Sequence, residues 1–440
     1  MTQTARRHLF IKSASAFLVG EPEHKGDWTN VPITWKATFP EKLFPILSGR
    51  LELTPVEKKL TRLTLSGMYE PPLGRLGGLI DDAVMHSVAE ATVREVAESI
   101  ARQLGDPDLL ARVLVDTAFA VVSLDGLDEQ LARAEEAVRL ADATGDPALR
   151  ALARYHWSAV LLTTADVAGS RAVLSEGITI AAEASPSVQW MMETTGIRNL
   201  LLDGRMTEVL VRNDECMAMG QRLGEQDAAS WWAALLTNVA WQRDDVGWMA
   251  DQLKAFADHF SGTLVWRGCE AVVLSVAGRV DEALALLRDH GITPELLNEE
   301  KMPACGPMQL AFLSFNAQDR ELAESVLRTL RPYRNCWAHF YLAAFAPISA
   351  ALGLCEWVLG NLDAAVELYD EALARINEAG AVGLTPLFCA YDAQLLLERG
   401  DPGDAERARH LLDQALEGAN LIGAPAIARK CEELAARLAQ

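Results

Sequence analysis

The sequence predicts a mainly α-helical protein, in which a small α+β domain precedes a long helical array. Three observations predict this fold class. Apolar residues recur at helical spacing through most of residues 105–440, and glycines divide that region into steps of about 40 residues. Residues 1–104 instead contain segments that alternate polar and apolar residues, as strands do. At 440 residues the chain is long enough for a solenoid and a second domain.

Residues 1–104 predict an antiparallel sheet followed by one long helix. Roughly four segments have the composition or alternation of strands, with a hairpin turn between the last two, at Pro55 to Lys59; they are residues 8–19, 28–39, 50–54 and 61–65. From about Leu76 to Leu104 the apolar period becomes helical. A sheet with one apolar face should pack that face against the helix.

Part of this domain resembles the C-terminal part of the helix-grip fold, the START-like or polyketide-cyclase-like (SRPBCC) superfamily. The resemblance covers about residues 28–104 and is carried by four runs: Leu51 to Pro55, Thr61 to Leu65, Tyr69 to Gly74 and Val88 to Val93. It implies a cavity between sheet and helix that binds an apolar small molecule. The candidate ligand-binding residues there are Trp35, Phe39 and Tyr69.

The resemblance also implies a partial domain. The family begins with a strand and two short helices, for which there is no room before His8. We therefore expect either that the helical array covers the open side or that the assigned start lies too far downstream. A small-molecule enzyme of the cyclase, aromatase or lipid-transfer type is the functional alternative that this domain suggests.

The same stretch has a superficial resemblance to a LuxR-type helix-turn-helix. Leu53 to Pro55 with Glu57, followed by residues 89–93, carry that resemblance. Three features speak against it: residues 61–65 alternate like a strand, residues 67–78 are rich in Gly and Pro, and a basic face is missing.

Residues 105–440 predict about eight helix pairs. Gly105-Asp106-Pro107 and Gly145-Asp146-Pro147 lie 40 residues apart, and each places Gly at a helix end and Pro in the next first turn. Similar punctuation recurs near Ser185-Pro186, Gly224, Gly262, Gly380 and Gly423. Residues 427–438 predict a capping helix, and the step near 295–335 is the least regular.

The most regular unit is Trp357 to Gly380 with the helix before it. Six residues fall at the spacing of a tetratricopeptide repeat, namely Leu352, Gly353, Gly360, Ala365, Tyr369 and Ala372. Asn377 stands where that family usually has proline. Residues 396–409 and 419–425 resemble the arrays of bacterial signalling ATPases, including adenylyl-cyclase-like and AfsR- or MalT-like regulators. The array implies recognition of a partner or ligand on its concave side, and no nucleotide-binding G-x-x-x-x-G-K-[ST] motif is present.

Charge is divided unevenly along the chain. Residues 1–104 carry a net charge of +1 and the remainder −22, which together give the total of −21. An acidic array disfavours nucleic acid, and it suits either a solubilising surface or a basic peptide or protein partner. Seven isolated cysteines predict a reducing cytoplasm. The sequence holds no signal peptide and no apolar run near ~20 residues, so no membrane span is expected.

Candidate array-site residues are four tryptophans in its middle: Trp231, Trp232, Trp241 and Trp266. They predict either an aromatic pocket or ordinary helix packing. The histidines are scattered without metal-ligand spacing, and no nucleophile motif is found, so we expect no metal, no cofactor and no catalytic residue. The leading hypothesis is a non-enzymatic recognition or regulatory protein that binds a protein segment or small effector.

Overall fold

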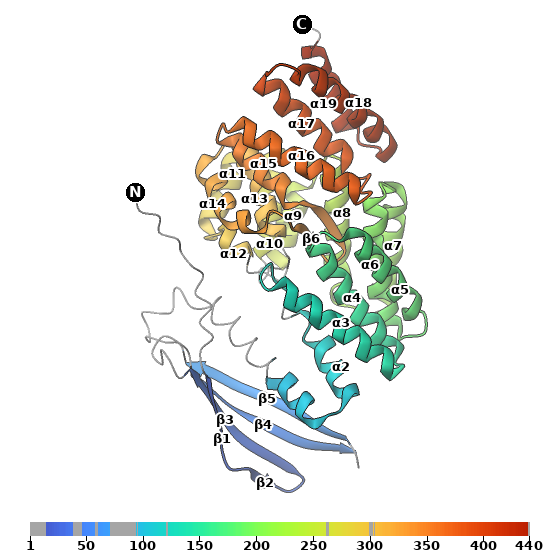
Figure 1. Ribbon diagram of the computed structural model, residues 1–440, viewed down its shortest axis with the longest axis vertical. Helices are drawn as coiled ribbons and strands as arrows, with labels where there is room; N and C mark the ends of the chain where they lie inside the picture. Colours follow the sequence, from blue (N-terminus) through green and yellow to red (C-terminus); the bar gives the residue numbers. More distant parts are fainter. Residues whose placement is uncertain are drawn as a thin grey trace. The chain divides into compact units, whose positions relative to one another are not determined.

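The computed structural model describes residues 15–37, 46–57, 60–70, 94, 96–119, 122–260, 264–298, 302 and 304–438. The chain divides into two compact units, Met1–Leu104 and Gly105–Gln440. Strands dominate the described part of the first unit and helices the second (Figure 1). The predicted class, mainly α with a small α+β N-terminal region, is therefore confirmed.

The first unit contains an antiparallel sheet of β1 (Ser15–Val19), β2 (Glu23–Lys25), β3 (Trp28–Ala37), β4 (Ile46–Glu57) and β5 (Leu60–Glu70). The strand order is β1-β3-β4-β5, and β2 pairs with the first three residues of β3, which β1 does not cover. Within the hairpin turn expected at Pro55 to Lys59, β4 instead continues to Glu57 through an irregularity in register after Pro55, and residues 58–59 lie outside the described residues. β5 also occupies the segment that a helix-turn-helix would need as a helix. Of the long helix expected after the sheet, most lies outside the described residues, and residues 96–104 are helical.

The second unit is a series of helices connected by short turns (Figure 1). The helices are α2 (Pro107–Asp116), α3 (Leu127–Thr144), α4 (Pro147–Thr163), α5 (Val167–Ala181), α6 (Pro186–Leu202), α7 (Met206–Leu223), α8 (Ala228–Gln242), α9 (Ala250–His259), α10 (Leu264–Val276), α11 (Val280–Asp289), α12 (Pro294–Asn298), α13 (Cys305–Ala317), α14 (Arg320–Leu330), α15 (Ile348–Val358), α16 (Leu362–Glu378), α17 (Thr385–Arg399), α18 (Asp404–Ile422) and α19 (Pro425–Leu438). Consecutive helices pack on each other from α2 to α8 and again from α13 to α19. The step predicted to be least regular contains the short helix α12.

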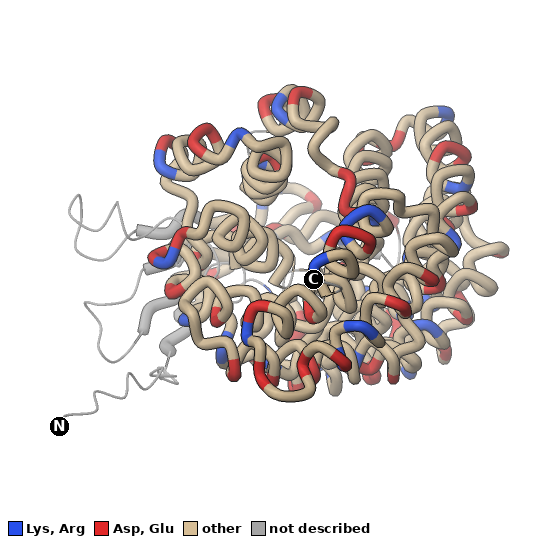
Figure 2. Tube along the Cα trace, turned by 90° about the horizontal axis from the view of Figure 1, so that it is seen from above, with Lys and Arg blue, Asp and Glu red and all other residues tan. Residues whose placement is uncertain are grey.

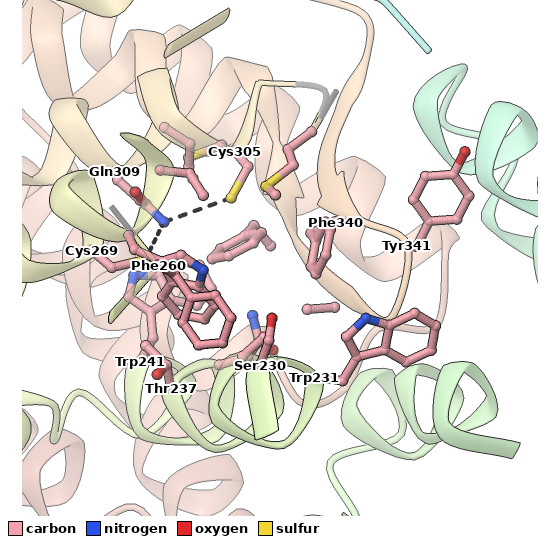
Figure 3. Close-up of a pocket in the computed structure, with 18 of the residues that line it drawn as sticks. Ser230, Trp231, Thr237, Trp241, Phe260, Cys269, Cys305, Gln309, Phe340 and Tyr341 are labelled. Carbon is pink, nitrogen blue, oxygen red and sulfur yellow. Dashed lines mark hydrogen bonds between the residues drawn. The ribbon is translucent and has the colours of Figure 1, made fainter. Parts of the chain in front are cut away.

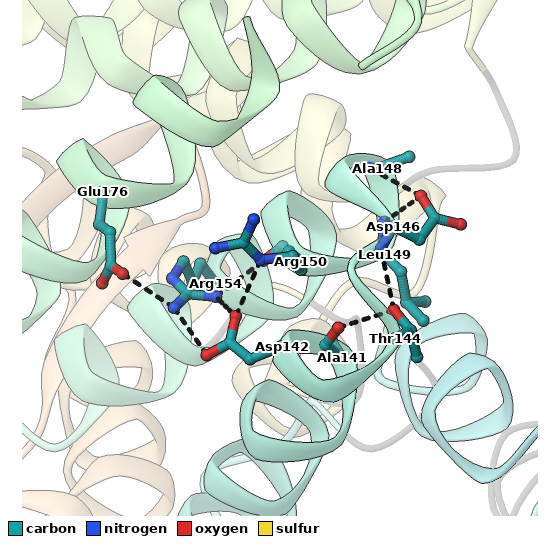
Figure 4. Close-up of polar contacts among 9 residues, drawn as sticks. All are labelled: Ala141, Asp142, Thr144, Asp146, Ala148, Leu149, Arg150, Arg154 and Glu176. Carbon is teal, nitrogen blue, oxygen red and sulfur yellow. Dashed lines mark hydrogen bonds and ion pairs between the residues drawn. The ribbon is translucent and has the colours of Figure 1, made fainter. Parts of the chain in front are cut away.

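The repeated Gly-Asp-Pro sequence begins two of these helices. Gly145 adopts a φ of +72°, a left-handed conformation that side-chain-bearing residues rarely take. The Asp146 carboxylate then accepts the N–H groups of Ala148 and Leu149 at 3.0 and 3.3 Å, so it caps the start of α4 (Figure 4). Asp106 caps α2 in the same way. The sequence therefore located both helix starts correctly.

Neighbouring helices are also joined by ion pairs, one of which has a buried arginine and exposed carboxylates. Arg154 of α4 is 4% exposed, and its guanidinium contacts Asp142 of α3 at 2.8 and 3.0 Å and Glu176 of α5 at 2.8 Å (Figure 4). Elsewhere Asp and Glu are interspersed with Lys and Arg around the outer turns of the helices (Figure 2). None of the helices in the described part of the chain has the length and apolar character that crossing a bilayer requires.

In the most regular unit the two helices pack closely. Ala365, Tyr369 and Ala372 of α16 are fully buried against α15. A Cβ at Gly353 would come within 2.7 Å of the Tyr369 ring, so only glycine fits at this contact. The helix pair therefore depends on a backbone approach that a larger residue would prevent.

One element of the second unit was not predicted: a β-hairpin of β6 (Trp337–Phe340) and β7 (Ala343–Pro347). The hairpin lies inside the array, where helices surround it (Figure 1). β6 packs on α4 and α13, and β7 packs on α6, α8, α15 and α16. The inner side of the array, expected to be a recognition surface, is thus partly occupied by the chain itself.

Candidate ligand-binding cavity

A cavity of about 450 Å³ lies between the hairpin and the inner helices of the second unit. Residues of α4, α6, α8, α10 and α13 line it together with the hairpin. Aromatic rings contribute much of the wall: Trp231, Trp241, Trp266, Phe312, Phe340 and Phe345. Of these, Trp231, Trp241 and Phe340 are labelled in Figure 3. A cavity of this size and composition is typical of sites for small organic ligands.

Three of the four candidate tryptophans meet in this cavity. Trp231 stacks on the buried Trp190 with ring centroids 4.8 Å apart. Trp241 meets Phe312 and Phe345 edge to face at 5.3 and 5.5 Å. Because neighbouring rings hold these side chains, the wall is formed before any ligand arrives.

The other candidates lie elsewhere. Trp232 is absent from the lining, and its indole N–H donates to the Asp214 carboxylate at 2.8 Å. In the first unit, strand pairing places Trp35 opposite Leu47 and Leu47 opposite Tyr69, so Trp35 and Tyr69 share one row across β3, β4 and β5. Phe39 lies outside the described residues.

The hairpin wall is fixed by polar contacts to helices far away in the sequence. Arg198 of α6 is 1% exposed and donates to the Tyr341 carbonyl at 2.7 Å and to Ser170 Oγ at 2.9 Å. His339 Nε2 lies 2.8 Å from Thr163 Oγ1. Buried hydrogen bonds of this kind fix one arrangement of a packed element, because leaving such groups unpaired is costly.

Tyr341 forms the tip of this wall. Its ring stacks on Tyr155 with centroids 4.7 Å apart, and its hydroxyl lies 3.3 Å from His156 Nδ1. Burial, reinforced by the charge of Arg133, lowers the pKa of His156 to about 4. Burial also raises the pKa of both tyrosines. All three side chains are therefore uncharged at neutral pH.

The remaining lining is almost free of charge. Asp227, at the exposed start of α8, is the single Asp, Glu, Lys or Arg among the described lining residues. The Gln309 side chain donates from Nε2 to Cys269 Sγ at 2.8 Å (Figure 3), and its Oε1 has no hydrogen-bond partner among the described residues. An uncharged aromatic wall with few hydrogen-bonding groups suits selection by shape and apolar contact.

Among the described residues, no group of three or more His, Cys, Asp or Glu side chains could hold a metal ion. The seven cysteines are free thiols, and six of them are buried. Burial raises the pKa of Cys355 and Cys389 to about 12, so both stay protonated at neutral pH.

Several lining residues were missed by the sequence reasoning: Phe340, Tyr341 and Phe345 of the hairpin, and Gln309 of α13. A signal for the first three was present. Residues 337–345 form an aromatic-rich run, W-A-H-F-Y-L-A-A-F, in a segment between predicted helices. Nothing local distinguishes Gln309 from other polar residues of a helix.

Comparison with known proteins adds no relative. No model of a known protein family matches the chain, and no curated protein matches its sequence. The function is therefore inferred from the chemistry of the cavity.

Proposed function

We propose that this chain is a non-enzymatic recognition protein that binds one small apolar molecule in the cavity between its helical array and its hairpin. The observation that carries the proposal is the aromatic, nearly uncharged lining. Trp231, Trp241 and Trp266 line the cavity together with the hairpin residues Phe340 and Phe345. Rings fixed by their neighbours bind an apolar ligand with little loss of side-chain freedom.

The size of the cavity sets the size of the ligand. One water molecule occupies about 30 Å³ in the liquid. A cavity of about 450 Å³ therefore has room for about 15 non-hydrogen atoms of that size. At ~0.3 kcal/mol per atom, a ligand of 15 to 20 such atoms would bind with about 5 kcal/mol, a Kd of roughly 0.2 mM. Tighter binding is expected for a ligand whose shape matches the wall.

A small effector agrees better with the geometry than a peptide does. The inner helices α4, α6, α8, α13 and α15 already pack on the hairpin, which occupies the place of an extended segment. A basic protein partner would instead have to use the outer turns, where Asp and Glu are interspersed with Lys and Arg (Figure 2). The proposal therefore concerns a small molecule inside the array.

The test is a fluorescence titration with the neutral apolar probe N-phenyl-1-naphthylamine. We expect saturable binding at one site per chain. Trp231→Leu should weaken binding at least tenfold, because the tryptophan lines the cavity. Trp232→Leu is the matched control and should change the Kd less than twofold, because that neighbour contacts Asp214 instead.

A variant that fills the cavity tests the same proposal without removing a tryptophan. Ala234 lines the cavity on α8, so Ala234→Phe should occupy it and abolish probe binding. Ala435→Phe, at an exposed position of α19, controls for added hydrophobic surface. Unsaturable binding to the wild type, or equal binding by the Ala234→Phe variant, would refute the proposal.

A further inference from the structure

A second chamber of about 310 Å³ adjoins the apolar cavity. Residues of α8, α10, α13, α17 and α19 line it. Trp241 and Phe312 line both spaces, so they form part of a shared wall. The second chamber differs from the first in carrying two opposite charges, Lys430 of α19 and Asp244, which follows α8.

The two charged groups do not neutralise each other directly. Among the described residues, no ion pair within 4.0 Å and no side-chain hydrogen bond joins Lys430 or Asp244 to any partner. The Lys430 ammonium instead lies over the Tyr391 ring, 3.7 Å from its centroid. Burial lowers the pKa of Lys430, while the charge of Asp244 opposes that shift. Both groups thus face the same chamber, and neither has an ion-pair or side-chain hydrogen-bond partner among the residues that the structure describes.

Asp244 is held in place by the end of its helix. Its φ of +54° turns the chain at the end of α8, and the next residue, Asp245, donates its N–H to the Ala240 carbonyl at 2.8 Å. Nearby, Asn316 Nδ2 donates to Ser275 Oγ at 2.9 Å, which leaves Asn316 Oδ1 as a further acceptor in the lining. The acceptors and the ammonium are therefore carried by different helices around one space.

The rest of the described lining is apolar or aromatic: Trp241, Phe312, Phe315 and Tyr391 provide ring surface. A ligand with a single charge would satisfy one of the two charged groups and leave the other in a partly dry space, which is unfavourable. A ligand with both charges satisfies both. An apolar substituent would find ring surface beside them.

We propose that this chamber binds a small zwitterionic molecule that carries an apolar substituent, such as a free aromatic or aliphatic amino acid. Its carboxylate pairs with Lys430 and its ammonium with Asp244, while the substituent lies against the aromatic wall. The site is separate from the apolar cavity, and the inference does not rest on the function proposed for that cavity.

Isothermal titration calorimetry of the full chain tests the pairing. The probes are the twenty free amino acids and glycine betaine, with phenethylamine and 3-phenylpropionate as analogues of L-phenylalanine that keep only one charge. We expect at least one zwitterion to bind with a Kd below about 1 mM. Each singly charged analogue of a phenylalanine-like ligand should bind at least tenfold more weakly.

Two variants test which charged group of the ligand contacts Asp244 and which contacts Lys430. Asp244→Asn keeps a residue that tolerates positive φ, and Lys430→Met keeps an apolar stem over Tyr391. Each should weaken zwitterion binding at least tenfold. Asp244→Asn should leave the affinity for 3-phenylpropionate unchanged or higher, and Lys430→Met should do the same for phenethylamine. Lys254→Met, which removes an exposed lysine of α9, is the control and should bind like the wild type.

Three outcomes would overturn the proposal. The first is that no zwitterion binds with a Kd below about 1 mM. Alternatively, 3-phenylpropionate or phenethylamine binds as tightly as L-phenylalanine, which would make the chamber a site for one charge. The third is that both variants bind like the Lys254→Met control. Binding of N-phenyl-1-naphthylamine in the first cavity is measured separately, so failure of either proposal can be told from failure of the other.

Discussion

The buried carboxylate of Asp392 in α17 provides a test of the packing, because burial and the nearby Arg407 shift its pKa in opposite directions. Asp392 is fully buried, and its Oδ2 accepts a hydrogen bond from Arg407 of α18 at 3.0 Å, while its Oδ1 has no hydrogen-bond partner in the described part of the chain. Arg407 also contacts Asp370 of α16. Burial raises the pKa of Asp392 from 3.8 to about 6, against the opposing effect of Arg407. We therefore predict that Asp392→Asn stabilises the protein relative to the wild type as the pH rises.

The magnitude follows from the two pKa values. Because the folded state binds the proton more tightly than the unfolded state, Asp392 stabilises the fold below its unfolded pKa of 3.8. That stability is lost as the pH rises through about 6. At about 1.4 kcal/mol per pKa unit, the change is about 3 kcal/mol. Asparagine keeps an oxygen for Arg407 and does not ionise, so the variant should gain up to this amount relative to the wild type between about pH 4 and pH 7.

Urea unfolding followed by circular dichroism measures this difference at each pH. The matched control is Asp404→Asn in the same region, because hydrogen bonds from Arg399 at 2.7 and 2.9 Å lower the pKa of Asp404. A lowered pKa gives stability above the unfolded value, so this variant should lose stability relative to the wild type as the pH rises. If Asp392→Asn shows the same sign as the control, the Arg407 ion pair outweighs burial and the reasoning fails.

Three further predictions use other contacts. Gly353→Val should cost about 1–3 kcal/mol of unfolding free energy in urea, because its Cβ would meet the Tyr369 ring; full stability would contradict the packing described. Asp146→Ala should cost about 1 kcal/mol in the same assay, since α4 loses its cap, and an unchanged midpoint would refute that role. The Kd of N-phenyl-1-naphthylamine should stay constant between about pH 5.5 and pH 8, because His156, with its pKa lowered to about 4, stays neutral; a change centred near pH 6.5 would contradict this.

Sequence reasoning succeeded where a single turn determines the local structure. Gly105-Asp106-Pro107 and Gly145-Asp146-Pro147 each combine a residue suited to positive φ, a capping carboxylate and a proline suited to the first helical turn. These effects act within a few residues, so the sequence shows them directly. The alternation that predicted β3, β4 and β5 is equally local.

The hairpin could not be predicted in the same way. Its strands contain alanines that suit a helix equally well, and its turn at Tyr341-Leu342 lacks the usual Asn-Gly or Asp-Gly signal. The residues that hold the hairpin in place, including Thr163 and Arg198, are far from it in the sequence. For the same reason the sequence could not separate Trp231, which lines the cavity, from Trp232, which does not.

The hairpin also changes how the array should unfold. In a simple solenoid each repeat contacts its neighbours only, so terminal repeats can fray independently. Here the contact between Arg198 and Tyr341 spans 143 residues, and the contact between Thr163 and His339 spans 176. Opening α4 or α6 must break these contacts, and forming them requires closing a long loop, which slows folding. We therefore expect α4 through α16 to exchange amide hydrogens as one cooperative unit, with a slower folding step than a hairpin-free array of equal length.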